Sequence, residues 1–336
     1  MKLNAPRFNL KAIVSLIMLI AGITPVIPQD GHDFNGDYRG KYLDRVAFPI
    51  GGIGAGMFCM DGTGSISHLS IEHKPDMENV PFAFAAISIK GLEKGAKVLE
   101  APVPEWKYYI TKPTRGSLGT GYGMPRFEQG RFLARFPFAT LELEDGDIPL
   151  EVSITGWSPF IPTDEDNSSL PSGAMEYTFR NTSGNKIEAV FSWNSGHFIS
   201  DQPDGKIIEA ENGFTLVKPN REEGTGPAAW FSIFVDHDAV VDYSWFDGRP
   251  RDAWAVLWND IEKCQLPHSP PGDKESLGAS IYVPFTLEKG EEKTVTVNFC
   301  WYVLPDTELS AGRKADHPGG CCDPEYPYYK PWYTER

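Results

Sequence analysis

The chain has 336 residues, enough for one large β domain or two ordinary domains with a substantial core. Its formal net charge of −15 at pH 7 argues against a nucleic-acid partner, because phosphate binding needs a basic face. The 33 glycines and 28 prolines interrupt the sequence, and long runs of helix-forming residues are scarce, so the composition favours strands and turns.

Residues 1–28 are typical of an export signal. Lys2, Arg7 and Lys11 supply positive charge around an apolar run, residues 12–23, that is too short to cross a membrane as a helix. We therefore predict an exported protein, periplasmic or secreted. The cleavage site lacks a clear small-residue pattern, so an uncleaved segment that anchors the chain to the membrane is the alternative. Residues 29–41 are predicted to be a polar linker.

From residue 42 onward, short strand-like segments alternate with turns. Apolar and polar residues alternate with period two in residues 139–144 and again in residues 150–155. The intervening Asp145-Gly146-Asp147 makes these two segments a predicted hairpin. Many short strands separated by Gly, Pro and Asn turns predict an all-β fold, either a sandwich or several stacked sheets. Further strands are predicted at residues 82–89, 175–180, 188–193, 230–235 and 294–301.

One helix is predicted, at residues 254–263. Trp254, Leu257, Trp258 and Ile261 are spaced i, i+3, i+4 and i+7, so they share one helical face. We expect this stripe to pack against a sheet, and a platform for sugars is the alternative. Residues 179–186 lie between two predicted strands and are typical of a turn at the edge of a sandwich.

Five cysteines in an exported chain leave at least one thiol without an internal partner. Cys300 lies in an alternating strand, so we predict a buried structural thiol. Near the C-terminus, His317, Cys321 and Cys322 are conceivable metal ligands, but adjacent cysteines match none of the usual zinc spacings. We expect a loop that carries thiols there, with no metal site and no cofactor.

A glycine cluster follows Pro49, in the sequence PIGGIGAG. A nucleotide-binding loop needs a strand before it and a helix N-terminus after it. Here a second predicted strand and another turn follow, and no Lys-Ser/Thr pair is present. We therefore expect these glycines to let the backbone pack closely against another surface.

No acid–base pair stands out in the sequence. Residues 164–166 (DED) lie in a polar loop predicted at the surface, and glycoside hydrolysis needs two carboxylates about 5 to 9 Å apart. His68 and His73 lie in one predicted strand, but an odd spacing places them on opposite faces if the strand is regular. We expect no catalytic histidine pair, and one histidine facing solvent or an interface.

Three segments occur in order along the chain: residues 49–56 (PIGGIGAG), 156–162 (GWSPFIP) with 167–171 (NSSLP), and 177–181 (YTFRN). Together they resemble the N-terminal domain of glycoside hydrolase family 116. This family includes non-lysosomal glucosylceramidases and bacterial β-glucosidases. Residues 277–301 are similar to the end of that domain, and the whole resemblance covers residues 42–336. It implies a large, supersandwich-like β-sandwich at residues 42–310.

The resemblance also implies that the catalytic residues lie outside this chain. Family members join the sandwich to an (α/α)6 toroid that carries both catalytic carboxylates, a Glu nucleophile and an Asp acid/base. Residues 311–336 resemble the linker into that toroid, and the toroid itself is absent from the sequence. We assign no catalytic residue here. The implied partner is the toroid, in cis or separately encoded, and through it a β-glucoside or glycolipid substrate.

Two functions are compatible with the sequence. The chain either buttresses such a toroid and shapes part of its sugar pocket, or it is a freestanding carbohydrate-binding or structural module. For the first, we expect an apolar patch beside the glycine cluster. A tight turn between strands is the alternative role for these glycines. The candidates for the pocket wall or the domain interface are Gly51, Gly52, Ile53, Gly54 and Gly56.

Overall fold

The computed structural model describes residues 32–72, 75–76, 79–108, 121–200, 205–219, 228–245, 250–272 and 276–304. The chain divides into two units, Met1–Gly36 and Asp37–Arg336. In the first unit, the Gly36 N–H donates to the Asp33 carbonyl at 2.8 Å and closes a turn. Every strand and helix in the described residues belongs to the second unit.

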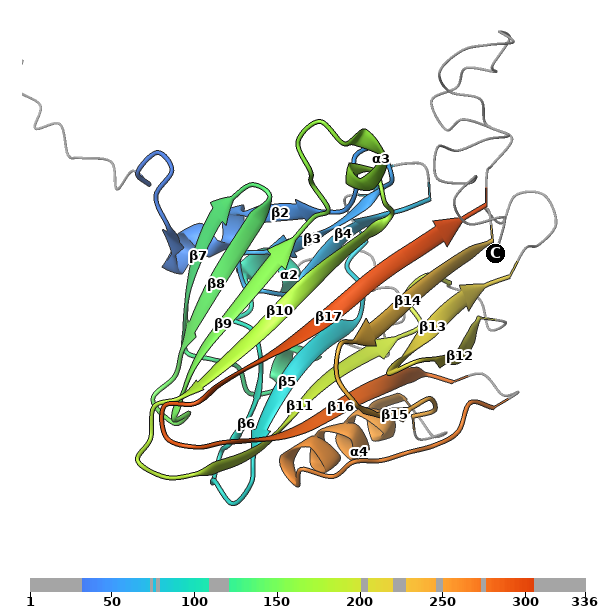
Figure 1. The fold of residues 1–336 in the computed structure, drawn as a ribbon. Coiled ribbons are helices and arrows are strands. Elements are labelled where there is room, and N and C mark those ends of the chain that lie inside the picture. Colours follow the sequence, from blue (N-terminus) through green and yellow to red (C-terminus); the bar gives the residue numbers. More distant parts are fainter. Residues whose placement is uncertain are drawn as a thin grey trace, which may run out of the picture. The chain divides into compact units, whose positions relative to one another are not determined.

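The secondary structure described for the second unit consists mainly of antiparallel strands (Figure 1). Several strands that are buried on both faces, such as residues 83–89, are rich in Ala, Ile and Phe. The strands are β1 Tyr38–Arg39, β2 Ala47–Ile50, β3 Met57–Asp61, β4 Ile66–Ser70, β5 Ala83–Ile89, β6 Ala96–Val98, β7 Gln129–Arg135, β8 Phe138–Glu144, β9 Leu150–Trp157, β10 Ser172–Asn181, β11 Ile187–Gly196, β12 Lys206–Ala210, β13 Gly213–Lys218, β14 Ala229–Val235, β15 Val240–Asp242, β16 Gly278–Leu287 and β17 Glu292–Val303.

In the described part of the chain these strands form three sheets. A nine-stranded sheet has the order β1-β7-β8-β9-β10-β17-β14-β13-β12, and a five-stranded sheet has the order β15-β16-β11-β5-β6. The third sheet, β2-β3-β4, packs at one end through Phe58, whose ring meets Phe299 of β17 at 4.9 Å. The all-β sandwich predicted from the sequence is therefore confirmed.

The core lies between the two large sheets. Tyr177 of β10 meets Phe191 of β11 with ring centroids 5.0 Å apart, and Trp193 meets Phe299 at 5.2 Å. These side chains are almost fully buried because alternation turns every second residue inward. The predicted hairpin is β8–β9, and its register places Thr140 opposite Thr155 on the outer face.

The predicted edge turn at residues 179–186 carries the chain from one large sheet to the other. It joins β10 of the nine-stranded sheet to β11 of the five-stranded sheet. Asn181 organises the turn: its amide donates to the carbonyls of Asn185 at 2.7 Å and Leu287 at 3.1 Å, and its carbonyl oxygen accepts from the Ser183 N–H. A buried Asn can satisfy several backbone groups at once, which explains its place at this crossing.

The predicted helix is α4, Pro250–Glu262, and its apolar stripe is a packing face. Leu257 and Ile261 are buried in one cluster with Phe84 and Ala86 on the outer side of β5. The expectation of a single helix is too simple, because single-turn helices occur at α2, Glu105–Tyr108, and α3, Glu165–Ser168. Short 3-10 turns also occur at η1, Gly40–Arg45, and η2, Gly121–Gly123.

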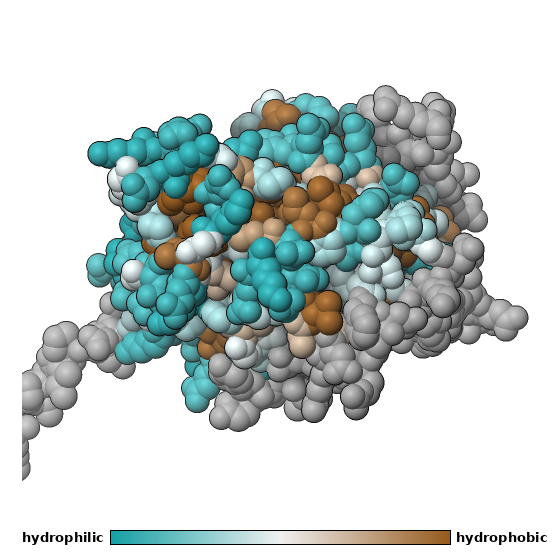
Figure 2. Space-filling view, turned by 90° about the horizontal axis from the view of Figure 1, so that it is seen from below, coloured by the Kyte–Doolittle hydropathy of each residue, from teal (hydrophilic) through white to brown (hydrophobic). Residues whose placement is uncertain are grey.

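Figure 2 shows the molecule from below relative to Figure 1. This face is mostly hydrophilic, and its apolar residues gather in patches near the middle. None of the helices in the described residues combines the length and the apolar character needed to span a membrane.

Candidate functional site

The glycine cluster forms the connection between β2 and β3. The two strands pair directly, with Ile50 opposite Phe58, and residues 51–56 lead from one to the other. A strand follows the loop where a nucleotide-binding loop needs a helix N-terminus, so the backbone geometry is that of a strand connection. We call residues 51–56 the glycine loop.

One side of the glycine loop is fastened to residues 158–170, the connection between β9 and β10. The Gly51 N–H donates to Ser158 Oγ at 3.0 Å, and the Ile53 N–H donates to the Ser168 carbonyl at 2.8 Å. At Gly52 a Cβ atom would lie 2.1 Å from the Leu170 carbonyl oxygen, so glycine is required by close backbone approach. Two sequence segments separated by about a hundred residues therefore meet here.

The other side of the loop contacts β4 and the end of β17. Trp301 Nε1 donates to the Ala55 carbonyl at 2.7 Å, and a Cβ at Gly56 would lie 2.8 Å from the Ser70 carbonyl oxygen. Gly56 also has φ +88°, a conformation that other residues rarely adopt. Most of the loop is therefore held rigidly by its neighbours.

Only the tip of the glycine loop reaches solvent. Ile53 is 59% exposed, and Gly54 is exposed with φ +74° and open space for 4 Å around the place that a Cβ would take. Gly52 is buried, while Gly51 and Gly56 are half-buried. Of the five candidates from the sequence, Ile53 and Gly54 are therefore the two that a partner or ligand can readily touch.

Exposed apolar side chains occur on the segment that holds this tip and on a loop packed against that segment. Phe136 and Phe160 meet edge-on with ring centroids 4.9 Å apart, and both are exposed, as is Ile161. The backbones of Ile53 and Ile161 both hydrogen-bond Ser168, which makes them neighbours. We call Ile53, Phe136, Phe160 and Ile161 the loop-end patch. These four residues are the candidates for the apolar patch that the sequence predicts beside the glycine loop.

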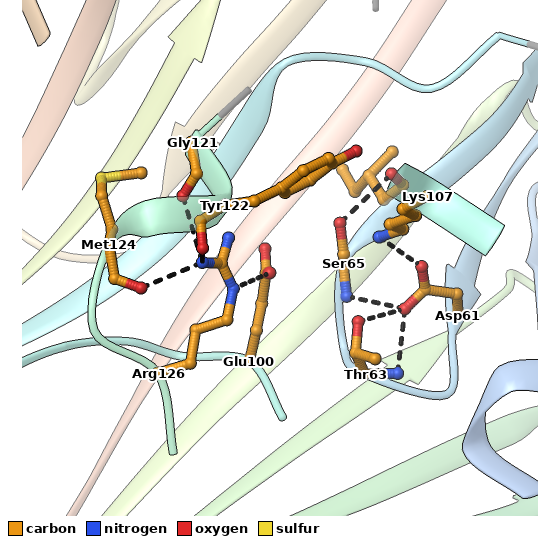
Figure 3. A network of polar contacts seen from close by, with 10 residues as sticks. Asp61, Thr63, Ser65, Glu100, Lys107, Gly121, Tyr122, Met124 and Arg126 are labelled. Carbon is orange, nitrogen blue, oxygen red and sulfur yellow. Dashed lines mark hydrogen bonds and ion pairs between the residues drawn. The ribbon is translucent and has the colours of Figure 1, made fainter. Parts of the chain in front are cut away.

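Behind β3, two buried ion pairs hold the segments on either side of residues 109–120 (Figure 3). Lys107 Nζ lies 2.6 Å from Asp61 Oδ2, and these side chains are 2% and 3% exposed. Arg126 Nε donates to Glu100 Oε2 at 2.9 Å, and its Nη1 donates to three backbone carbonyls in residues 121–124. Both carboxylates are therefore engaged in ion pairs, an arrangement that suits structural anchors.

Asp61 also organises the turn that follows β3. Its Oδ1 accepts from the Thr63 N–H at 2.9 Å, from Thr63 Oγ1 at 2.6 Å and from the Ser65 N–H at 3.2 Å. Together with Lys107 at Oδ2, these donors give both carboxylate oxygens a polar partner, which offsets the hydration that Asp61 loses on burial.

The structure describes one of the two histidines considered in the sequence. His68 has φ +51°, so β4 is irregular at this residue and alternation cannot assign its face. The ring is half-buried, with Nδ1 2.7 Å from Ser67 Oγ. Burial lowers the pKa of His68, and nearby Lys107 adds to this while Asp61 opposes it. His73 lies outside the described residues.

The expected burial of the cysteine thiols is met only in part. Cys300 is half-buried on the outer face of β17 instead of fully buried, and burial raises its pKa. Cys59 is buried, and desolvation raises the pKa of its thiol to about 11. His317, Cys321 and Cys322 lie outside the described residues. Across the described ranges, no cluster of three or more His, Cys, Asp or Glu side chains is suited to a metal ion.

Two carboxylates outside the ion pairs have perturbed environments. Asp164 caps α3 by accepting from the Asn167 backbone and side-chain amides, and the side-chain hydrogen bond is the main cause of its lowered pKa. Asp242, at the end of β15, is buried, and desolvation raises its pKa although Ser269 and Ser244 donate to it. Because burial is the main cause of this shift, the raised pKa of Asp242 by itself assigns it no chemical role.

A sequence model of one protein family matches residues 47–336. It is described as beta-glucosidase 2, glycosyl-hydrolase family 116 N-term. No curated protein sequence matches the chain.

Among solved structures, similar chains include a bacterial glucoamylase complexed with acarbose (11% identity, TM-score 0.40, covering 84% of this chain and 35% of that one). A polysaccharide lyase matches with 10% identity and a TM-score of 0.31, over 76% of this chain and 32% of that one. The chain thus spans about a third of the length of these two proteins.

Proposed function

The chain belongs to the N-terminal domain family of glycoside hydrolase family 116, and we propose that it is the non-catalytic sandwich of a retaining β-glucosidase or glucosylceramidase. In this role it docks to a catalytic (α/α)6 domain and forms part of the wall of that domain's sugar pocket. We further propose that the protein is exported, because residues 1–28 have the charge and apolar run of an export signal.

One observation carries the docking proposal: a rigidly anchored loop presents an exposed tip inside an apolar patch. Hydrogen bonds to Ser158 and Ser168 and from Trp301 fix the glycine loop, so little entropy is lost when its tip is buried by a partner. Ile53 and the aromatic pair Phe136–Phe160 supply apolar anchors of the kind that dominate protein interfaces.

The proposal assigns chemistry to the partner, so the full chain alone is expected to be inactive. We expect no hydrolysis of an aryl β-glucoside above buffer, measured as release of the aryl group at several pH values. Turnover by the purified chain that disappears in Asp242→Asn, with the melting temperature unchanged, would show that this domain is itself catalytic. Turnover that persists in this variant and survives further purification would also contradict the proposal, whereas turnover lost on further purification comes from a contaminating enzyme.

Docking is tested by mixing the full chain with a separately produced (α/α)6 domain of a family-116 β-glucosidase. Ile53→Asp is expected to weaken the complex at least about tenfold in Kd, because a buried unpaired charge costs more than about 1.4 kcal/mol. Ile208→Asp is the matched control, because Ile208 is 44% exposed on β12, at an edge of the nine-stranded sheet. Equal Kd values for the two variants would mean that the interface lies elsewhere on the chain. Failure of the unmodified chain to form a complex would contradict the docking proposal.

A further inference from the structure

The outer face of the nine-stranded sheet carries two kinds of side chain, which the strand register separates. Toward the hairpin turns far from the glycine loop, the facing residues are charged or hydroxylic, as in the row Arg131, Glu142, Ser153, Thr178 and Thr294. At the end of the sheet nearer the glycine loop, aromatic side chains occupy positions on this outer face. A polar outer face is ordinary for an antiparallel sheet, whereas exposed aromatic residues in neighbouring strands need an explanation.

The aromatic group begins with Phe138 of β8 and Trp157 of β9, which are opposite each other in the register. Phe138 is 51% exposed and Trp157 is half-buried. Trp157 Nε1 donates to Glu176 Oε1 of β10 at 3.0 Å, so the indole leans over β10. Its own partner in that strand, Ala174, is small and fully buried. The hydrogen bond to Glu176 therefore holds the indole at its polar edge, and the side chain stays half-buried on the outer face of the sheet.

Hydrogen-bonding groups border this aromatic pair. Thr140 and Thr155 lie one row further along β8 and β9, with their hydroxyl oxygens 3.3 Å apart. Asn298 lies opposite Ala174 on β17, and Thr296 lies opposite Glu176. The hydroxyls, the amide and the carboxylate thus form a half-exposed polar rim around a fixed indole.

We propose that Trp157 and Phe138 form a binding platform for a neutral β-linked glucan, distinct from the glycine loop. A pyranose ring whose hydroxyls are all equatorial presents an apolar C–H face that stacks on the negative face of an aromatic ring. Its hydroxyls then project sideways, toward Thr155, Glu176 and Asn298. This proposal does not depend on docking to a catalytic domain, because the platform belongs to this chain and can bind a glucan without a partner.

The surroundings favour a sugar over a protein or an acidic glycan. Protein interfaces are depleted of charge at their centre, whereas Glu176 sits beside the indole and threonines surround the pair. The loop-end patch, with two aliphatic and two aromatic side chains, is the more apolar surface and suits a protein better. A net charge of −15 and the nearby carboxylate repel anionic polysaccharides.

The test measures binding of cellohexaose to the full chain by titration calorimetry, with maltohexaose as the comparison sugar. The α-linked chain curls, so it cannot lay successive rings flat on the pair. We expect saturable binding of cellohexaose at millimolar concentrations and weaker binding of maltohexaose. High salt should not reduce the affinity for cellohexaose, because the sugar is uncharged. Trp157→Ala is expected to weaken cellohexaose binding about tenfold, and Phe138→Ala by a smaller factor.

Trp258→Ala is the matched control. Trp258 is also half-buried, and its Nε1 donates to Glu262 Oε1 at 2.8 Å, but it lies on α4 at another surface. It should leave the affinity unchanged. Phe138→Ala keeps the test valid if Trp157→Ala fails to fold, because Phe138 is half exposed. The inference is overturned if cellohexaose does not bind, or if Trp258→Ala weakens binding as much as the platform variants.

Discussion

Replacing Lys107 with methionine is expected to lower the free energy of unfolding by about 3–5 kcal/mol, a large share of the roughly 5–15 kcal/mol typical of a domain. Methionine keeps most of the apolar length of the side chain but leaves the Asp61 carboxylate charged and unpaired in the interior. Its present partner is the Lys107 ammonium at 2.6 Å, and both groups are almost completely buried. Urea unfolding followed by tryptophan fluorescence measures the change.

A second substitution shows whether the loss comes from the charge. In Lys107→Met with Asp61→Asn, the amide oxygen still accepts from Thr63 and Ser65, but no unpaired charge remains. We expect this double variant to recover about 2 kcal/mol relative to Lys107→Met alone. Lys90→Met is the control for loss of an exposed pair, since Lys90 and Glu188 are both largely in solvent, and its midpoint should stay near that of the unmodified chain. A double variant less stable than Lys107→Met would contradict the explanation.

The sequence predicts local structure well wherever one face of an element is buried. The period-two pattern of residues 139–155 becomes the β8–β9 hairpin, and the i, i+3, i+4, i+7 stripe at Trp254 becomes the packed face of α4. In both cases, residues close together in the sequence determine which face of the element is buried. The family resemblance then supplies the sandwich topology that no local pattern contains.

Long-range contacts are what the sequence cannot provide. Asp61 and Lys107 look like ordinary surface charges in a sequence, because nothing local shows that the chain between them folds back to bury both. Likewise, the glycine loop is fixed by Ser158 and Ser168, which belong to a separate segment of the resemblance. The signal that remains is the co-occurrence of these segments in order, which indicates a contact without identifying the atoms.

The Trp157–Phe138 platform could not be predicted from the sequence for a different reason. Phe138 begins one alternating run and Trp157 ends the next, so each resembles a core residue at the end of a strand. Only the register, with Phe138 opposite Trp157 on the outer face, shows that the two belong together. The hydrogen bond from Trp157 to Glu176 then explains why a tryptophan is tolerated on an exposed face, since its N–H is satisfied.

Glycines of the same loop are expected to respond very differently to alanine. Gly52→Ala should cost about 3 kcal/mol, because the new Cβ would lie 2.1 Å from the Leu170 carbonyl oxygen and backbone on both sides must move. Gly54→Ala should cost only about 1 kcal/mol, the strain of a left-handed residue, because the space around it is open. Thermal and urea unfolding of the full chain measure both. Equal losses would mean that the loop is not anchored on Leu170.

The same pair of variants separates the two roles proposed for the loop. In a complex with the catalytic (α/α)6 domain, Gly54→Ala places a methyl group at the exposed tip beside Ile53 while leaving the anchored part of the loop in place. If the tip forms part of the sugar pocket, KM or kcat for an aryl β-glucoside should worsen although the domain remains folded at the assay temperature. If the glycines serve only the strand connection, Gly54→Ala should leave kinetics unchanged, and Gly52→Ala should reduce activity only in proportion to the unfolded fraction. Kinetics measured against the folded fraction of each variant therefore decide between a pocket wall and a turn.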